Sequence, residues 1–379
     1  MAQVIVAELR PRLQACSIFI TSEDGLLTNK MVKMSIKPSD IDIEWSSYAR
    51  TIVQKITLPG CRLVPNTLSC LRAEDEFVSF RVQTEPLTGL HGSFSREIIP
   101  MTFNENGEQR TINESTAPNI IASNTCQISC HCCGNELARY HVQRVLPLPS
   151  GNLDSSEWFC HGGHGHGTKF SLAPHSGDLL YGPCYFLMSK EWLQPSALNS
   201  NDTRVARCKR CLAWLGTSVT SHITLWNCTV SIDDSSCSSP LQDFIKCVAH
   251  AITSCVGLMC RVIVETQVME EETQYILLWI IDKNLQILTN SEAREIHCAD
   301  NNSFIETVLK PQNTVKLLYL HQSCFTSVVK AWQDDVSVQC INVAKSMFTD
   351  GLEHMRKMTK CIPQPYRVTN NFFTAYLQV

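Results

Sequence analysis

The amino-acid sequence predicts a β-rich α+β protein with an N-terminal antiparallel β domain, a cysteine-rich middle segment and a C-terminal mixed α/β domain. Three observations support this prediction: apolar residues alternate in residues 1–124, closely spaced cysteines mark residues 125–215, and a capped helix lies among apolar strands in residues 216–379. The chain has 379 residues, which is long enough for several domains. An apolar share of 44%, a charged share of 18% and a formal net charge of −4 are typical of a folded globular protein.

The first domain is predicted from short strands with period-two alternation. Apolar side chains alternate with polar ones over residues 32–36, 41–45 and 78–82, and proline, glycine and aspartate break the chain between them. Strands at this spacing are typical of an antiparallel sandwich or partial barrel. The polar residues 104–119 then predict a loop or linker.

The C-terminal domain is predicted from a helix signal followed by strands. Ser239 is an N-cap residue, Pro240 suits the first helical position, Gln242 completes a capping box, and apolar residues recur at helical spacing as far as Val256. The last helix is expected from Gln339 to about Thr359. The strands expected between the two helices are residues 261–268, 274–282, 285–288 and 314–320.

Composition also indicates which partners to expect. The densest basic cluster, residues 204–211, is small, so we expect no direct nucleic-acid binding. The longest apolar run, residues 275–281, is too short to cross a bilayer, and charged residues interrupt the N-terminal stretch where a signal peptide would need an apolar core. We therefore expect no membrane contact and a cytoplasmic and nuclear location.

Twenty cysteines are many for a reducing compartment, where disulfides are disfavoured. Close pairs are then more typical of metal ligands, whereas scattered cysteines among apolar neighbours are expected to be small core residues. The scattered ones considered are Cys16, Cys61, Cys228, Cys247 and Cys255.

Two C-x-x-C hooks are the strongest chemical signal. Cys130 and Cys133 form the first and Cys208 and Cys211 the second, and each is followed by a glycine that permits a tight turn. Two such hooks supply four thiolates, the set that structural Zn²⁺ prefers. The sequence therefore predicts a structural Zn²⁺ bound by these four cysteines, which makes the middle part a zinc-stapled segment.

Alternatives to this ligand set remain open. The 74 residues between Cys133 and Cys208 exceed the usual finger spacing, so the hooks could be unrelated pairs, one of them redox-active. His131 and Cys132 lie inside the first hook and compete as ligands.

The insertion between the hooks contains EWFCHGGHGHG, residues 157–167. Three interpretations are open: a second zinc site using Cys160 and two histidines, a thiolate of Cys160 activated by His161, or a solvated loop. Trp158 and Phe159 indicate an anchor that docks into a partner. No Ser–His–Asp signature, P-loop or dinucleotide fingerprint is present in the sequence.

Several of these features together resemble one family. They are VLPLPS at 145–150, the EW-x-CH element at 157–161, both hooks, and the YILLWII and VKLLYL strands. In this order they resemble the HECT-like, E2-binding family of E3 ubiquitin-protein ligases, whose fungal relatives act in messenger-RNA 3′-end formation. The resemblance runs over roughly residues 55–379 and is strongest between 126 and 216.

The resemblance implies function, partners and sites. It implies an enzyme that takes ubiquitin from an E2 ubiquitin-conjugating enzyme, with an E2-binding segment at about 226–250 and a HECT-like tail at about 343–379. It also implies binding and inhibition of the metallo-β-lactamase endonuclease that cleaves pre-messenger RNA before polyadenylation. The partner-binding residues would be Glu157, Trp158 and His161, with Cys160 offered to the zinc of that nuclease.

The chain departs from the family pattern at the transfer residue. A HECT reaction needs a cysteine that accepts ubiquitin as a thioester, usually in a Thr-Cys pair near the C-terminus. The best-matching position here holds Met347-Phe348, and the remaining candidates are Cys340 and Cys361. Two classes therefore stay open: a thioester-forming transferase, and a non-catalytic, zinc-stabilised binding or chaperone module.

Overall fold

The computed structural model describes residues 3–10, 13–22, 31–46, 51–74, 76–86, 102–103, 109–110, 124–148, 174–182, 184–199, 205–219, 221–233, 235–236, 238–255, 260–267, 272–297 and 302–378. Contacts divide the chain into two compact units. Unit 1 comprises Met1–Thr102, Trp279–Leu320 and Met355–Val379, and unit 2 comprises Phe103–Leu278 and His321–His354. Each unit thus joins stretches that are far apart in the sequence, whereas the predicted domains were contiguous ranges.

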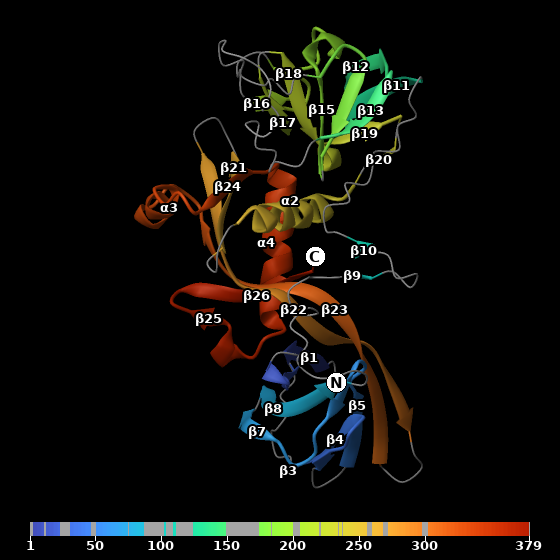
Figure 1. Ribbon diagram of the computed structural model, residues 1–379, viewed down its shortest axis with the longest axis vertical. Coiled ribbons are helices and arrows are strands. Elements are labelled where there is room, and N and C mark those ends of the chain that lie inside the picture. The colour runs from blue at the N-terminus through green and yellow to red at the C-terminus, as the bar shows by residue number, and fades with distance from the viewer. Residues whose placement is uncertain are drawn as a thin grey trace, which may run out of the picture. The chain divides into compact units, whose positions relative to one another are not determined.

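Unit 1 is built almost entirely of strands, drawn in blue, orange and red in Figure 1. They are β1 (Gln3–Arg10), β2 (Ala15–Ser22), β3 (Met31–Ile36), β4 (Asp40–Ser46), β5 (Thr51–Thr57), β6 (Cys61–Leu63), β7 (Ser69–Glu74), β8 (Phe77–Pro86), most of β22 (Thr273–His297) and β23 (Asn302–Gln322), β25 (Val368–Thr369) and β26 (Phe372–Gln378). A short 3-10 helix, η5 (Gln364–Tyr366), precedes β25.

The strands of unit 1 pair in the order β3-β4-β5-β23-β22-β1-β2-β8-β6. The pairs β1–β2, β2–β8, β3–β4 and β4–β5 are antiparallel, as predicted for the N-terminal part. In contrast, β23 runs parallel to β5. The three predicted strands correspond to β3, β4 and β8, and Ile41, Ile43 and Trp45 all point into one core cluster. The predicted β-rich α+β class is confirmed.

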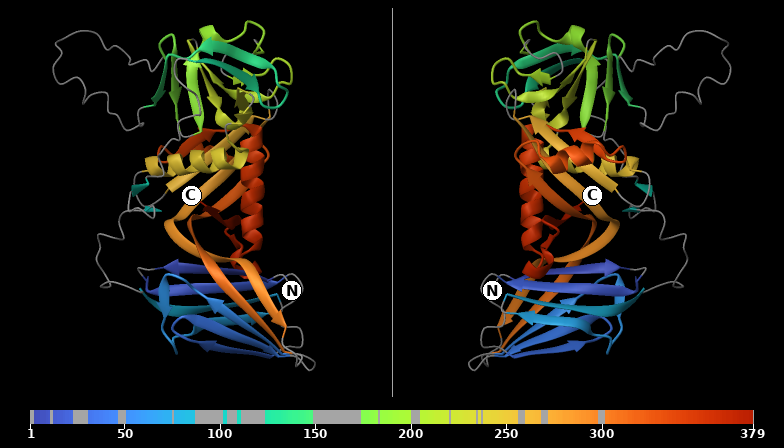
Figure 2. Two further views of the ribbon diagram at one scale, coloured as in Figure 1. Left: turned by 90° about the vertical axis from the view of Figure 1, so that its right-hand side faces the viewer. Right: turned by 90° about the vertical axis from the view of Figure 1, so that its left-hand side faces the viewer.

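Unit 2 contains two further sheets and most of the helical residues (Figure 2). One sheet has the order β12-β11-β19-β20 and the other β13-β14-β15-β18-β17-β16. The strands are β11 (Thr125–Cys130), β12 (Glu136–His141), β13 (Arg144–Pro147), β14 (Asp178–Tyr181), β15 (Tyr185–Ser189), β16 (Val205–Arg207), β17 (Trp214–Ser218), β18 (His222–Trp226), β19 (Val230–Ile232) and β20 (Ser235–Ser236). Two 3-10 helices, η3 (Lys190–Trp192) and η4 (Asn227–Thr229), connect them, and both sheets contribute to one hydrophobic core.

The rest of unit 2 carries helix α2 (Pro240–Ser254), strands β21 (Cys260–Gln267) and β24 (Gln339–Asn342), helix α3 (Ser327–Gln333) and the first part of helix α4 (Lys345–Lys360). Helix α2 contacts both strands. The predicted capping box is present, with Ser239 Oγ accepting from Gln242 N at 3.2 Å. No helix among the described residues is long and apolar enough to cross a membrane.

Helix α4 corrects one prediction. A helix was expected from Gln339, but Gln339–Asn342 form β24, which pairs in parallel with Val262–Glu265 of β21. The backbone N–H and C=O groups of these four residues pair with a strand much earlier in the chain. The spacing of nearby apolar residues cannot reveal pairing with so distant a segment. The helix begins at Lys345, close to where its apolar stripe becomes regular.

The long strand β22 corrects a second prediction. Residues 274–282 and 285–288 were expected to be separate strands, but they form one strand that continues to His297. Asp282-Lys283-Asn284, between them, contains neither proline nor glycine, so nothing in the chain interrupts the extended backbone. The predicted linker 104–119 lies largely outside the described residues, apart from Gln109–Arg110, which pair as β10 with β9 (Thr102–Phe103).

Strand β1 is buried on both faces. Ile5, Ala7 and Leu9 belong to one core cluster, whereas Val6 belongs to a second cluster on the opposite face. Alternation then places Glu8 on the face of Val6, and its side chain is only 2% exposed. A carboxylate at this position needs partners.

Three side chains donate to Glu8. Lys316 Nζ and Tyr376 Oη each lie 2.6 Å from Oε1, and Arg10 Nη2 lies 2.9 Å from Oε2. Burial alone would raise the pKa of Glu8, but these partners lower it below its ordinary value. The carboxylate therefore joins β1 to β23 and β26, which come from the other end of the sequence.

We expect Glu8→Gln to lower the free energy of unfolding by about 3 kcal/mol, because it leaves Lys316 without its buried anionic partner. Denaturant unfolding at neutral pH measures this change. The matched control is Glu85→Gln on β8, where the side chain is exposed, and it should leave stability unchanged. Equal effects of the two variants would contradict the role of Glu8.

The same network has a pH signature. Because the pKa of folded Glu8 lies below the ordinary value of 4.5, its contribution is fully present above that pH and is lost as the pH falls through the folded value. The unfolding free energy should therefore fall as the pH is lowered below about 4.5. Glu8→Gln should show a smaller loss over that window, and an identical pH profile would contradict the prediction.

Candidate metal centre

The first hook is a tight turn at the end of β11. Cys130 N donates to Asn135 O at 2.8 Å, and Gly134 N donates to Cys130 O at 2.8 Å. Gly134 has φ of +69°, a left-handed conformation that favours glycine. The turn directs the backbone of Cys130 and Cys133 around one point, as predicted for a zinc knuckle.

The second hook repeats this turn. Cys208 N donates to Ala213 O at 3.0 Å, and Leu212 N donates to Cys208 O at 2.9 Å. The left-handed position is occupied by Leu212, with φ of +61°. The two hooks therefore share one backbone geometry although only the first carries glycine at the turn.

Gly216 has a different role from the one predicted. It was expected to allow the second turn, but it lies in β17, where a Cβ would be 1.8 Å from Thr224 O of β18. The absence of a side chain lets these two strands approach, and the turn itself depends on Leu212.

The two hooks bring their sulfur atoms together. All four Sγ atoms lie within 4.8 Å of one another, with Cys130–Cys211 at 3.7 Å and Cys133–Cys208 at 3.7 Å. A tetrahedral zinc about 2.3 Å from each sulfur would separate neighbouring sulfurs by about 3.8 Å. The four cysteines could therefore hold one metal ion, and the distances suit zinc.

The four cysteines come from two different sheets. Cys130 ends β11 in one sheet, and Cys208 follows β16 in the other. Arg210 Nη1 of the second hook donates to Cys133 O of the first at 3.1 Å. Burial raises the pKa of Cys130, although backbone N–H groups of Cys133 and Cys132 act in the opposite direction. Metal binding releases the thiol proton, because the ligand is the thiolate.

Of the two competing ligands in the first hook, His131 points away from the four sulfurs and Cys132 lies beside them. His131 is exposed, and its Nδ1 lies 3.1 Å from Ser231 Oγ. Cys132 is exposed and hydrogen-bonds with Cys211, but it is not one of the four sulfurs that lie within 4.8 Å of one another. Within the described part of the chain, the cluster consists of the first and fourth cysteine of each hook.

The two predicted C-terminal candidates, Cys340 and Cys361, belong to different units of the structure. Cys340 is exposed on β24, where burial of the sulfur and then the Glu265 carboxylate raise its pKa. Cys361 follows α4 in unit 1, and burial raises its pKa although Lys357 and Arg367 act in the opposite direction. Met347 and Phe348, at the best-matching transfer position, are buried in α4.

The predicted partner-binding element, Glu157–His161, lies outside the described residues. Its flanks are described: β13 and β14 are adjacent parallel strands, and Arg144 makes two 2.7 Å contacts with the Asp178 carboxylate across them. The two strands that flank residues 149–173 are therefore neighbours in one sheet.

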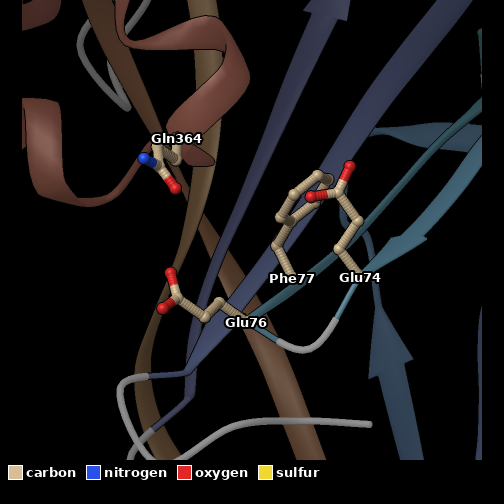
Figure 3. A pocket seen from close by; sticks show the side chains of 4 residues that line it. All are labelled: Glu74, Glu76, Phe77 and Gln364. Atoms are coloured by element: carbon tan, nitrogen blue, oxygen red, sulfur yellow. The ribbon is translucent and has the colours of Figure 1, made fainter.

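An open pocket of about 460 Å³ lies in unit 1, at the β7–β8 hairpin and η5. Figure 3 shows its lining by Glu74, Glu76, Phe77 and Gln364. It contains none of the predicted site residues, and its lining consists of two carboxylates, one aromatic ring and one amide.

Comparison with known proteins decides the family. The family model described as HECT-like ubiquitin-conjugating enzyme (E2)-binding matches residues 8–374. The chain belongs to the HECT-like E2-binding family. The resemblance inferred from the hooks and strands is thereby confirmed over nearly the whole chain. No solved structure shows significant similarity to this chain.

Some relatives match nearly the full length of the chain. Two proteins named as E3 ubiquitin-protein ligases, from Homo sapiens and Pongo abelii, are 26% and 25% identical, over 99% of this chain and 98% of theirs. The protein of the same name from Rattus norvegicus is 27% identical over 67% of this chain and 70% of its own.

Sequence reasoning missed one further cysteine pair. Cys16, Cys61, Cys228 and Cys255 are buried, as predicted for core residues, but Cys247 is half-buried and its Sγ lies 3.0 Å from Cys184 Sγ. The two residues are 63 positions apart and neither belongs to a C-x-x-C motif, so no sequence signal indicated the pair.

We expect the purified chain to bind about one zinc ion and the Cys130→Ser, Cys208→Ser double variant to bind none, because two ligands cannot complete the tetrahedron. Metal analysis after gel filtration measures the ratio. Cys132→Ser is the matched control and should keep the metal, since Cys132 lies outside the cluster. Loss of zinc from the control, or its retention by the double variant, would refute the assignment.

Proposed function

We propose that the chain is an E3 ubiquitin-protein ligase that engages an E2 and promotes transfer of ubiquitin from it, with a structural Zn²⁺ held by the four hook cysteines. The family match over residues 8–374 carries this proposal, because that family is described by its binding of the ubiquitin-conjugating enzyme. The names of the full-length relatives support it.

The E2-binding segment implied by the resemblance, residues 226–250, falls on η4, β19, β20 and most of α2. Helix α2 is anchored to η4 by Asp243, whose buried carboxylate accepts from Cys228 N at 2.8 Å and from Ser238 Oγ at 2.7 Å. Phe244 packs against α4, where a Cβ at Gly351 would lie 2.5 Å from its ring. These contacts support α2 as a firmly held element for a partner to bind.

The proposed route of ubiquitin transfer follows from the two candidate cysteines. A thioester acceptor needs an accessible thiolate, and the surroundings of Cys340 and Cys361 raise the pKa of both thiols. We therefore propose direct transfer: a substrate amine attacks the ubiquitin carbonyl of the E2 thioester, and the E2 thiolate leaves. The ligase contributes binding and orientation.

We expect the chain to accelerate discharge of ubiquitin from charged E2 to free lysine, with no thiol-sensitive ubiquitin adduct on the chain itself. Non-reducing gels of a single-turnover reaction measure both. The double variant Cys340→Ala, Cys361→Ala should be as active as the unmodified chain. An adduct that disappears in the double variant would establish the thioester route, and no acceleration with any E2 would remove the ligase proposal.

We also propose that residues 157–161 bind and inhibit the pre-messenger-RNA 3′-end-processing endonuclease, as the resemblance implies. Cys160 would occupy the position of zinc-bound water in that enzyme, because a thiolate is a stronger zinc ligand than water and blocks hydrolysis. Glu157, Trp158 and His161 would hold the element in place. The paired strands β13 and β14, which hold both flanks, support this proposal.

We expect the chain to inhibit purified endonuclease and Cys160→Ala to relieve that inhibition, since the ligand atom is removed. A cleavage assay with a short RNA substrate measures it. The double variant His164→Ala, His166→Ala is the matched control in the same stretch and should still inhibit. Undiminished inhibition by Cys160→Ala would refute the zinc-ligand role.

A further inference from the structure

Unit 2 contains a second pair of sulfur atoms with a different spacing from the hooks. Cys184, immediately before β15, and Cys247, in the middle of α2, place their Sγ atoms 3.0 Å apart. The hook sulfurs are 3.7 Å apart, close to the edge of a zinc tetrahedron. The Cys184–Cys247 separation is about 1 Å longer than a disulfide bond of about 2.05 Å.

The pair does not extend into a metal site. In the part of the chain that the structure describes, the four hook cysteines are the one group of three or more ligating side chains close enough to share an ion. Cys228 and Asp243 lie near enough to Cys184 to affect its titration, but they do not join it in such a group. Two sulfurs without further ligands suit bond formation with each other better than metal binding.

The two cysteines differ in access, which gives each a separate role. Cys184 is 1% exposed, whereas Cys247 is half-buried and can be reached from solvent. The hydrogen bond to Cys247, burial and the nearby Asp243 carboxylate all raise the pKa of Cys184. Cys247 is therefore the sulfur that meets an external reagent, and Cys184 is the one that resolves the product.

We propose that Cys184 and Cys247 form a thiol–disulfide site that a low-molecular-mass disulfide oxidises to an intramolecular bond. The Cys247 thiolate attacks one sulfur of the reagent, forming a mixed disulfide and releasing one thiolate. Cys184 then attacks the Cys247 sulfur, breaks the mixed disulfide and passes its proton to the second departing thiolate. Two protein thiols are oxidised and one small disulfide is reduced to two thiols.

The bond would tie α2 to the six-stranded sheet of unit 2. Helix α2 already contacts η4 through Asp243, and Asn227 N at the start of η4 donates to Cys184 O at 2.9 Å. Both cysteines therefore sit on elements that are already held together, so the bond can form in the folded protein. This inference is independent of ubiquitin transfer and of the nuclease.

The test uses the full chain, glutathione disulfide as the oxidant, alkylation of remaining thiols and a tryptic map. Residues 170–190 contain Cys184 as their single cysteine, and residues 247–261 contain Cys247, Cys255 and Cys260. We expect these two peptides to become linked before any hook cysteine is oxidised, and dithiothreitol to separate them. Circular dichroism on the same sample should show an unchanged fold.

Two variants identify which cysteine of the peptide forms the link. Cys247→Ser should abolish the link, whereas Cys255→Ser, at the end of the same helix and in the same peptide, should retain it. A Cys247 that stops at the mixed disulfide, a link that forms only in denaturant, or a link that survives Cys247→Ser would each overturn the proposal. A second zinc ion lost in Cys247→Ser would also overturn it, in favour of a metal site.

Discussion

In unit 2, a tetrahedral zinc site needs both hooks, because each hook supplies two thiols and zinc takes four ligands. One hook ends β11 and the other follows β16, so shared coordination would fix the edge of one sheet against the other across their common core. Arg210 adds a direct hydrogen bond between the hooks. Strands β13 and β14, which flank residues 149–173, belong to the second of these sheets and depend on the same core.

Unit 2 contains two groups of cysteines whose sulfur–sulfur distances suit different chemistry. The hooks hold their sulfurs at the distance of a tetrahedral edge, and the turns that do so are hydrogen-bonded loops. Cys184 and Cys247 are brought together instead by the packing of α2, through Asp243 and η4. The first arrangement suits a permanent structural ion, and the second suits a bond that forms and breaks.

Local sequence patterns predicted the structure correctly where it depends on contacts between residues only a few positions apart. The cap at Ser239 and Gln242 lies where it was predicted, and so do the alternating strands β3, β4 and β8. They failed where a distant partner decides the conformation. Residues 339–342 were predicted as the start of the last helix, but they pair in parallel with β21 and are extended. The turn of the second hook likewise rests on Leu212 rather than on the glycine that the pattern favoured.

The sequence by itself determined the β-rich class, the helix start at Pro240 and the hook cysteines. The order of the motifs along the chain also indicated the family. The β-rich class, the helix start and the hooks depend on neighbours within a few positions, so spacing and residue type suffice to identify them. Only the tertiary structure decided that the hooks converge, that Glu8 meets Lys316 and Tyr376 from the far end of the chain, and that Cys184 meets Cys247. Such contacts arise from strand pairing and core packing between distant segments, and no local pattern encodes which segments will meet.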